Sequence, residues 1–154
     1  MFATRLTISL AVAGWAGRLA AALLMAMPVA AHAADISWKA NMASGAATVR
    51  GSVARVGTAV MNTGETVDVK LESTDGATDD KGRIAVSADA VMQFKDGSSI
   101  ATRYAGVRDP RTQEVAGSGE FVGGTGKYQG ITGPFTYKGL AGQAEYVGTY
   151  SLKR

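Results

Sequence analysis

The chain has 154 residues, a formal net charge of +3, one histidine and no cysteine. The missing cysteines exclude disulfides and thiolate nucleophiles, and the single histidine, His32, lies in the first 33 residues. Residues 34–154 therefore contain no Ser-His-Asp triad, no histidine base and no zinc or copper site built from His and Cys. We expect no metal and no cofactor, and any proton chemistry would use Asp, Glu, Lys, Tyr or Arg.

Residues 1–33 have the order of a secretory signal peptide. Arg5 and Arg18 precede an apolar run over residues 19–27, which is followed by a proline and a small-x-small site ending at Ala33. The alternative is an uncleaved membrane anchor, but the nine apolar residues fall short of the roughly 20 that a spanning helix needs. We predict cleavage after Ala33 and export to the periplasm or beyond as a protein that does not span a membrane.

Residues 34–154 form one predicted domain that is nearly neutral. Arg5 and Arg18 are two of the sixteen basic residues, which leaves fourteen Lys and Arg against thirteen Asp and Glu, a net charge of +1. A balance of this kind does not favour nucleic acid as a partner. The 121 remaining residues are enough for one hydrophobic core.

Strand patterns begin at once in this domain. Residues 36–42 alternate apolar and polar side chains, and so do residues 66–72, where Val67, Val69 and Leu71 share one face. Residues 48–60 are rich in valine but lose the alternation, which predicts bulges or a turn near Gly57.

The next segment, residues 73–82, is predicted to be a loop. It holds Asp75, Asp79 and Asp80 close together, and carboxylates in such a cluster suit calcium. The spacing differs from that of an EF-hand loop and no matching glutamate follows, so we favour a solvated turn, for which Asp and Gly are the usual residues.

Five further strands follow at short intervals. Residues 84–94 alternate without a break, Asp96-Gly97 is a hairpin signal, and residues 98–107 continue as the partner strand. Pro110 predicts a turn over residues 108–111. The last three predicted strands cover residues 113–122, 130–138 and 144–153.

Eight strands joined by short connections predict an all-β, antiparallel domain. An open sheet of this kind leaves exposed edges, whereas closure removes them, so we favour a single eight-stranded barrel over a sandwich.

Seven glycines stand out over residues 117–137. The run Gly-Gly-Thr-Gly-Lys invites comparison with a phosphate-binding loop, but such a motif requires glycine at position 121 and Ser or Thr at 128, where this chain has Phe121 and Tyr128. We therefore interpret these glycines as structural, serving turns, bulges and close strand approach. Those we assign this role are Gly123, Gly124, Gly126, Gly130 and Gly133.

Residues 120–137, EFVGGTGKYQGITGPFTY, resemble the glycine motif of the allene oxide cyclase-like and dirigent-like barrels, which include small exported bacterial proteins. The resemblance implies an eight-stranded antiparallel barrel of the calycin type, often assembled as a trimer. In plants, these barrels cyclise an unsaturated epoxide or steer the coupling of phenolic radicals.

Three functions compete. The first is a non-catalytic exported barrel that binds a small apolar or phenolic molecule in its mouth or lumen. Aromatic rings with a polar tip suit such a pocket. The candidate contacts are Trp38, Tyr104, Tyr128 and Tyr137.

The second is a cyclase or isomerase in which Glu120, buried beside Arg103 or Lys127, transfers a proton. This hypothesis requires Glu120 and Arg103 to point inward. The third is a structural or interaction module with a filled lumen.

Overall fold

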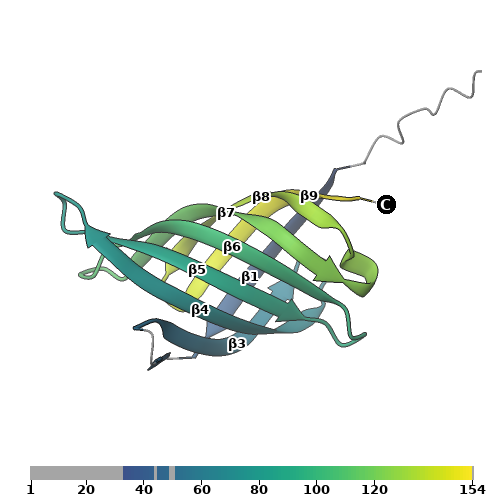
Figure 1. Ribbon diagram of the computed structural model, residues 1–154, viewed down its shortest axis with the longest axis horizontal. Coiled ribbons are helices and arrows are strands. Elements are labelled where there is room, and N and C mark those ends of the chain that lie inside the picture. Colours follow the sequence, from purple (N-terminus) through teal and green to yellow (C-terminus); the bar gives the residue numbers. More distant parts are fainter. Residues whose placement is uncertain (1–32, 44, 49–50, 154) are drawn as a thin grey trace, which may run out of the picture.

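The computed structural model describes residues 33–43, 45–48 and 51–153, and it is built of β-strands with a single turn of 3-10 helix (Figure 1). Apart from Ala33, the predicted signal peptide lies outside these residues. The described segments include no helix long and apolar enough to cross a membrane. The elements are β1 (Ala34–Met42), β2 (Ala46–Ala47), β3 (Val53–Met61), β4 (Thr66–Thr78), β5 (Ile84–Gln93), β6 (Ser99–Arg108), β7 (Glu114–Thr125), η1 (Gly126–Tyr128), β8 (Ile131–Leu140) and β9 (Gln143–Leu152).

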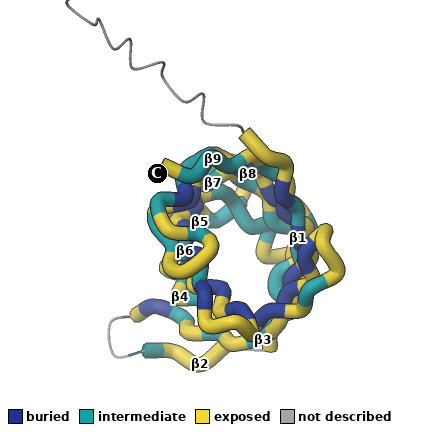
Figure 2. The backbone as a smooth tube through the Cα atoms, turned by 90° about the vertical axis from the view of Figure 1, so that its right-hand side faces the viewer, coloured by how far each residue is buried: buried dark blue, intermediate teal, exposed yellow. Residues whose placement is uncertain are grey.

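Eight of these strands form a closed antiparallel barrel, as the sequence predicted. Each strand from β3 to β9 pairs with the next, β9 pairs with β1, and β1 returns to β3. Viewed end-on, the strands form a ring (Figure 2). The two-residue β2 continues the line of β1 along the edge of β3, with Ala46 opposite Ala54.

The alternation of each strand sorts its side chains between the lumen and the outer wall. On β5, Ala88, Ala90 and Met92 are buried inside the barrel, whereas Asp89 and Val91 between them are exposed. Successive side chains of a strand point to opposite faces, so one face of each strand supplies the core.

One end of the barrel is closed by side chains. Lys127, in η1, places its Nζ 3.0 Å from Asp96 Oδ2 and 3.2 Å from Glu65 Oε2, which joins three turns. The same Nζ lies 4.7 Å from the centre of the Phe94 ring and 5.4 Å from that of Tyr128. This cation therefore covers the aromatic side chains that fill the closed end.

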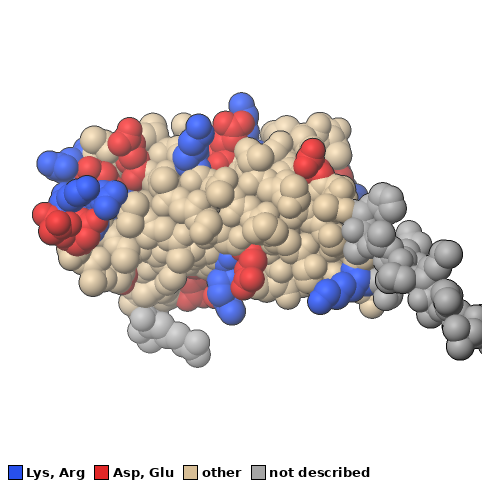
Figure 3. Space-filling model, turned by 90° about the horizontal axis from the view of Figure 1, so that it is seen from above, with Lys and Arg blue, Asp and Glu red and all other residues tan. Residues whose placement is uncertain are grey.

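The opposite end is the mouth, surrounded by the turns at residues 79–83, 109–113 and 141–142. In the space-filling view, charged side chains gather at this end, on the left, while much of the adjoining wall is uncharged (Figure 3).

The structure corrects the prediction near Gly57, which lies within the continuous strand β3. Gly57 is opposite Met42 of β1, and a Cβ on it would lie 2.2 Å from the carbonyl oxygen of Asn41. The glycine permits the two strands that close the barrel to approach, so it marks close contact and not a turn.

The predicted loop at 73–82 is also corrected, because β4 continues to Thr78. Its extension pairs with β5 as far as Thr78 opposite Ile84, with a shift of register between Asp75 and Thr78. Polar side chains are compatible with this strand because its far end projects beyond the core at the mouth. Only residues 79–83 form the turn.

Candidate ligand-binding site

A cavity of about 140 Å³ lies inside the mouth. Deeper in the lumen, the next void has a volume of only about 10 Å³, too small for more than one water molecule. The lumen is therefore packed at the closed end and hollow at the mouth. Side chains lining the hollow include Arg55, Leu71, Val86, Ala88, Tyr104, Arg108, Val115, Tyr137 and Tyr146.

Three tyrosines, Tyr104, Tyr137 and Tyr146, provide the aromatic surface of the cavity. The Tyr104 and Tyr137 rings meet edge to face, with centroids 5.0 Å apart, and the Tyr146 ring stacks on Tyr137 at 5.4 Å. On its other side, Tyr146 stacks against Trp38 at 4.8 Å with nearly parallel planes. The tyrosines are thus held in place by aromatic packing that extends into the core.

Two facing glycines make room for Tyr137. Gly106 of β6 is opposite Gly117 of β7. A Cβ on Gly106 would lie 2.4 Å from the Tyr137 hydroxyl oxygen, and one on Gly117 would lie 2.7 Å from a ring carbon of Tyr137. The missing side chains therefore create the space in which this ring lies.

The tyrosine hydroxyls are neutral over the physiological range. Burial raises the pKa of Tyr137 to about 12, and it raises the pKa of Tyr104 and of Tyr146 above its ordinary value. For Tyr104 the neighbouring hydroxyls of Tyr146 and Tyr137 add to the effect of burial. The cavity therefore offers O–H groups that can donate as well as accept.

Two arginines enter the mouth and differ in their partners. Arg108 donates from Nη2 to Asp75 Oδ2 at 2.6 Å, which neutralises both side chains at the rim. Arg55 extends from the inward face of β3, and its buried Nε has no hydrogen-bond partner among the described residues. The positive charge of Arg55 lowers the pKa of the Tyr104 hydroxyl, but burial raises that pKa by more.

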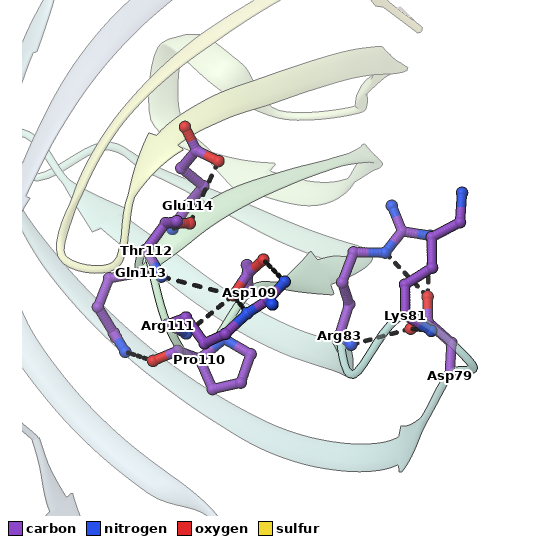
Figure 4. Close-up of polar contacts among 9 residues, drawn as sticks. All are labelled: Asp79, Lys81, Arg83, Asp109, Pro110, Arg111, Thr112, Gln113 and Glu114. Carbon is purple, nitrogen blue, oxygen red and sulfur yellow. Dashed lines mark hydrogen bonds and ion pairs between the residues drawn. The ribbon is translucent and has the colours of Figure 1, made fainter.

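The turns around the mouth are held by their own charges (Figure 4). Asp79 accepts hydrogen bonds from the backbone N–H of Arg83 at 2.8 Å and from its Nε at 2.8 Å. Asp109 accepts from the backbone N–H of Arg111 at 2.8 Å and forms an ion pair with its side chain. These hydrogen bonds lower the pKa of both carboxyl groups, so each turn is compact and internally paired.

The structure separates the aromatic residues that the sequence grouped together. Tyr104 and Tyr137 line the cavity, and Trp38 supports it from beneath. Tyr128 lies at the closed end, 4.7 Å from Phe94 and 6.3 Å from Tyr150 between ring centroids. It is therefore remote from the mouth.

The proposed acid and its cation lie on the outer wall. Glu120 and Arg103 are opposite one another on β7 and β6, and both are exposed. Arg103 pairs with Asp89 at 2.9 Å, and both side chains of that pair are 67% exposed. The burial that the proton-transfer hypothesis required is absent, so we do not carry this version of a cyclase or isomerase forward.

The grouped aspartates of the calcium alternative have other partners. Asp75 pairs with Arg108, and Asp79 pairs with Arg83. Among the described residues, no three His, Cys, Asp or Glu side chains are grouped as metal ligands.

The glycines assigned structural roles differ among themselves. Gly126, Gly130 and Gly133 have positive φ, and a Cβ on Gly124 would lie 2.5 Å from the carbonyl oxygen of Tyr128. Gly123 has neither restriction, since a Cβ there would meet nothing within 4 Å. Gly123 is opposite Ala101, beside a shift of register between β6 and β7, so it lies at an irregularity of the predicted kind but is not restricted to glycine by φ or by contact.

Three residues of the site were missed from the sequence: Tyr146, Arg55 and Arg108. Tyr146 has the inward parity of its strand, and so does Arg55, which shares the inward face of β3 with Val53 and Ala59. Parity alone could have identified both as lumen residues. The pairing of Arg108 with Asp75 depends on residues 33 positions apart and carries no local signal.

Taken together, the fold and the site define a closed eight-stranded antiparallel barrel with an aromatic pocket at one end. Comparison of the sequence with models of protein families and with curated proteins found no match.

Proposed function

We propose that this protein is a non-catalytic, exported barrel that binds a small aromatic or apolar molecule at its mouth. The observation that carries the proposal is the cavity of about 140 Å³ that lies inside the mouth against the rings of Tyr104, Tyr137 and Tyr146. Sites for small molecules are typically concave, mostly apolar and provided with a few polar groups that set orientation. The mouth has each of these properties.

The size of the cavity limits the ligand to about one ring. A protein cavity of roughly 150 Å³ accommodates benzene, so this hollow suits one aromatic ring with a small substituent. Leu71, Val86, Ala88 and Val115 supply apolar contacts for the ring, while the tyrosine hydroxyls supply polar ones.

The polar residues of the cavity support binding over catalysis. Ser73 donates to the carbonyl oxygen of Val53 at 3.4 Å, and Asp75 is paired with Arg108. Neither is arranged as a nucleophile with an adjacent base, which is the usual requirement for covalent catalysis by serine.

The binding test uses the purified protein with phenol, toluene and cyclohexane as probes. We expect the aromatic probes to change the fluorescence of Trp38 saturably and to raise the melting temperature with increasing concentration, because a ligand that binds only the native state stabilises it. Ala88→Leu should fill the cavity and abolish both effects. Ala105→Leu, on the outer wall, makes the same change in size and should leave both effects intact.

The proposal fails if none of the probes gives a saturable signal with the unaltered protein. If Ala88→Leu does not fold, Val86→Phe, nearer the rim of the same cavity, replaces it.

Export and kinship are separate proposals that rest on the sequence. The signal-peptide pattern of residues 1–33 supports export, and expression of the full chain in a bacterium should yield a periplasmic or secreted protein beginning at Ala34, as read by N-terminal sequencing. The glycine motif of residues 120–137 supports kinship with the allene oxide cyclase-like and dirigent-like barrels. A shared barrel by itself carries no activity from one protein to another.

A further inference from the structure

We infer that the ligand of the mouth is an anion, specifically a single-ring aromatic monocarboxylate, and that Arg55 binds its carboxylate. The inference rests on the proposed function and goes beyond it by assigning the charge of the ligand and the residue that recognises it.

Arg55 is the one arginine without an acidic partner among those whose side chains the structure describes. Each of the other four has a side-chain nitrogen within 3.2 Å of a carboxylate oxygen of its own aspartate. The pairs are Arg83 with Asp79, Arg103 with Asp89, Arg108 with Asp75, and Arg111 with Asp109. The four paired arginines lie on the outer wall or at the rim, whereas Arg55 faces the lumen.

A guanidinium group without an acidic partner at this position is unfavourable for the folded protein. Its Nε is buried and makes no hydrogen bond within the described chain, so folding removes this N–H from water without replacing its acceptor. A bound carboxylate would supply that acceptor, because the planar guanidinium group matches the two oxygens of a carboxylate.

Among the described residues that line the cavity, the only acidic side chain is that of Asp75, and it is not free to take this place. The carboxylate of Asp75 is held by Arg108 at 2.6 Å. Burial keeps the Tyr104 hydroxyl neutral, and this is the group on which the charge of Arg55 acts. Of the charged side chains that line the cavity, Arg55, Asp75 and Arg108, only Arg55 is left without a counter-charge, so the complementary ligand is negative.

The remaining contacts define the rest of the ligand. The rings of Tyr104, Tyr137 and Tyr146 offer faces and edges to an aromatic ring, and the volume of about 140 Å³ admits one ring only. A planar carboxylate attached directly to the ring adds little volume, which suits the space left between the tyrosines and Arg55.

The test compares benzoate with benzamide, which has nearly the same shape but no charge. Calorimetric titration of the unaltered protein should give benzoate roughly 10- to 100-fold tighter binding, the range expected for a hydrogen bond to a charged group. Arg55→Gln should reduce benzoate binding to the level of benzamide and leave benzamide binding unchanged. Arg55→Lys, which keeps the charge but not the planar fork, should retain part of the preference.

Arg103→Gln is the matched control, because it removes an exposed arginine from the outer wall and should alter neither affinity. Equal affinities of the unaltered protein for benzoate and benzamide would overturn the inference and leave the proposed function standing. Failure of both probes, and of phenol and toluene, would overturn the proposed function itself. The benzoate and benzamide comparison needs no variant, so misfolding of Arg55→Gln cannot obscure the result.

Discussion

At the scale of single residues, the burial of three tyrosine hydroxyls controls the protonation of the mouth. Tyr104, Tyr137 and Tyr146 share the cavity wall, and for each of them burial is the main cause of a raised pKa. A phenol in such surroundings retains its proton well above the pH at which it would ionise in water. The native protein therefore holds protons in alkaline solution that the unfolded chain loses.

This difference predicts a loss of stability at high pH. In the unfolded chain, tyrosine titrates near about 10, whereas the pKa of native Tyr137 is about 12. Above pH 10 the unfolded state binds fewer protons than the native state, so the free energy of unfolding falls as the pH rises. We expect the urea midpoint to decrease above pH 10, and the phenolate absorbance at about 295 nm to appear at higher pH in the native than in the urea-unfolded protein.

Tyr137→Phe should make this alkaline decrease shallower while preserving the ring contacts. If the native and unfolded proteins gave the same absorbance titration, these hydroxyls would not be buried as the structure places them.

Two glycines of one motif are predicted to respond differently to the same substitution. Gly126 has a φ of +59°, and a Cβ on it would lie 2.8 Å from the Cβ of Ser98, so Gly126→Val should destabilise the protein by about 1–3 kcal/mol. Gly123→Val should have little effect, because the space around it is open and its φ is not positive. Urea unfolding of the two variants measures the difference in their free energies of unfolding. Similar losses of stability in both would contradict the assignment of a glycine requirement to Gly126 and not to Gly123.

At the scale of elements, η1 fastens the closed end. The Lys127 Nζ binds both Glu65, at the end of the β3–β4 turn, and Asp96 of the β5–β6 turn. The hydroxyl and backbone N–H of Ser98 hold the same aspartate, and together with Lys127 they lower the pKa of Asp96 to about 2. Three connections distant in sequence thus meet at one cation.

Lys127→Met should weaken this end modestly. We expect a lower urea midpoint at low salt and a smaller loss in about 1 M salt, because exposed ion pairs are screened. Lys39→Met is the control, since Lys39 forms only a 3.7 Å pair with Glu145 on the outer wall. A loss of stability that does not depend on salt would mean that packing, and not charge, holds η1 in place.

The stabilising contribution of the Asp96 carboxylate should be present above pH 4 and disappear as the pH falls toward 2, because the native pKa of Asp96 is lowered to about 2. Unfolding at stepwise lower pH measures this loss.

At the scale of the whole molecule, closure depends on the contact between β1 and β3. These strands pair from Trp38 opposite Met61 to Met42 opposite Gly57, so the first strand of the barrel seals the sheet. Without this pairing, both strands would present unpaired edges, and exposed edges promote association between chains.

Gly57→Val tests the seal directly. The added side chain would meet the backbone of Asn41 and Met42, which cannot move away without breaking the pairing, so we expect a loss of about 1–3 kcal/mol or more and association on size-exclusion chromatography. Thr58→Val, on the exposed face of the same strand, should remain stable and keep the elution volume of the unaltered protein. A stable Gly57→Val variant with unchanged elution would contradict this view of closure.

Local patterns were enough to predict eight strands and most of their turns. Alternation decides which side chains of a strand share a face, and Asp96-Gly97 specifies a hairpin turn through a glycine with a φ of +84°. These are properties of neighbouring residues, and antiparallel strands with short connections then favour closure. Gly57 misled the prediction because a glycine that permits close strand contact has the same local signal as one that permits a turn.

Only the tertiary structure decided how far along the barrel each side chain lies and which residue each charged side chain pairs with. Tyr128 and Tyr137 are only nine residues apart, yet they lie at opposite ends, because η1 and β8 carry the chain from the closed end toward the mouth. Glu120 and Arg103 are true neighbours, but they face outward, and Arg55 lacks the partner that every other described arginine has. Such relations follow from the register between strands distant in sequence, so the sequence by itself determined the wall of the barrel, and the packing of the closed structure determined its site.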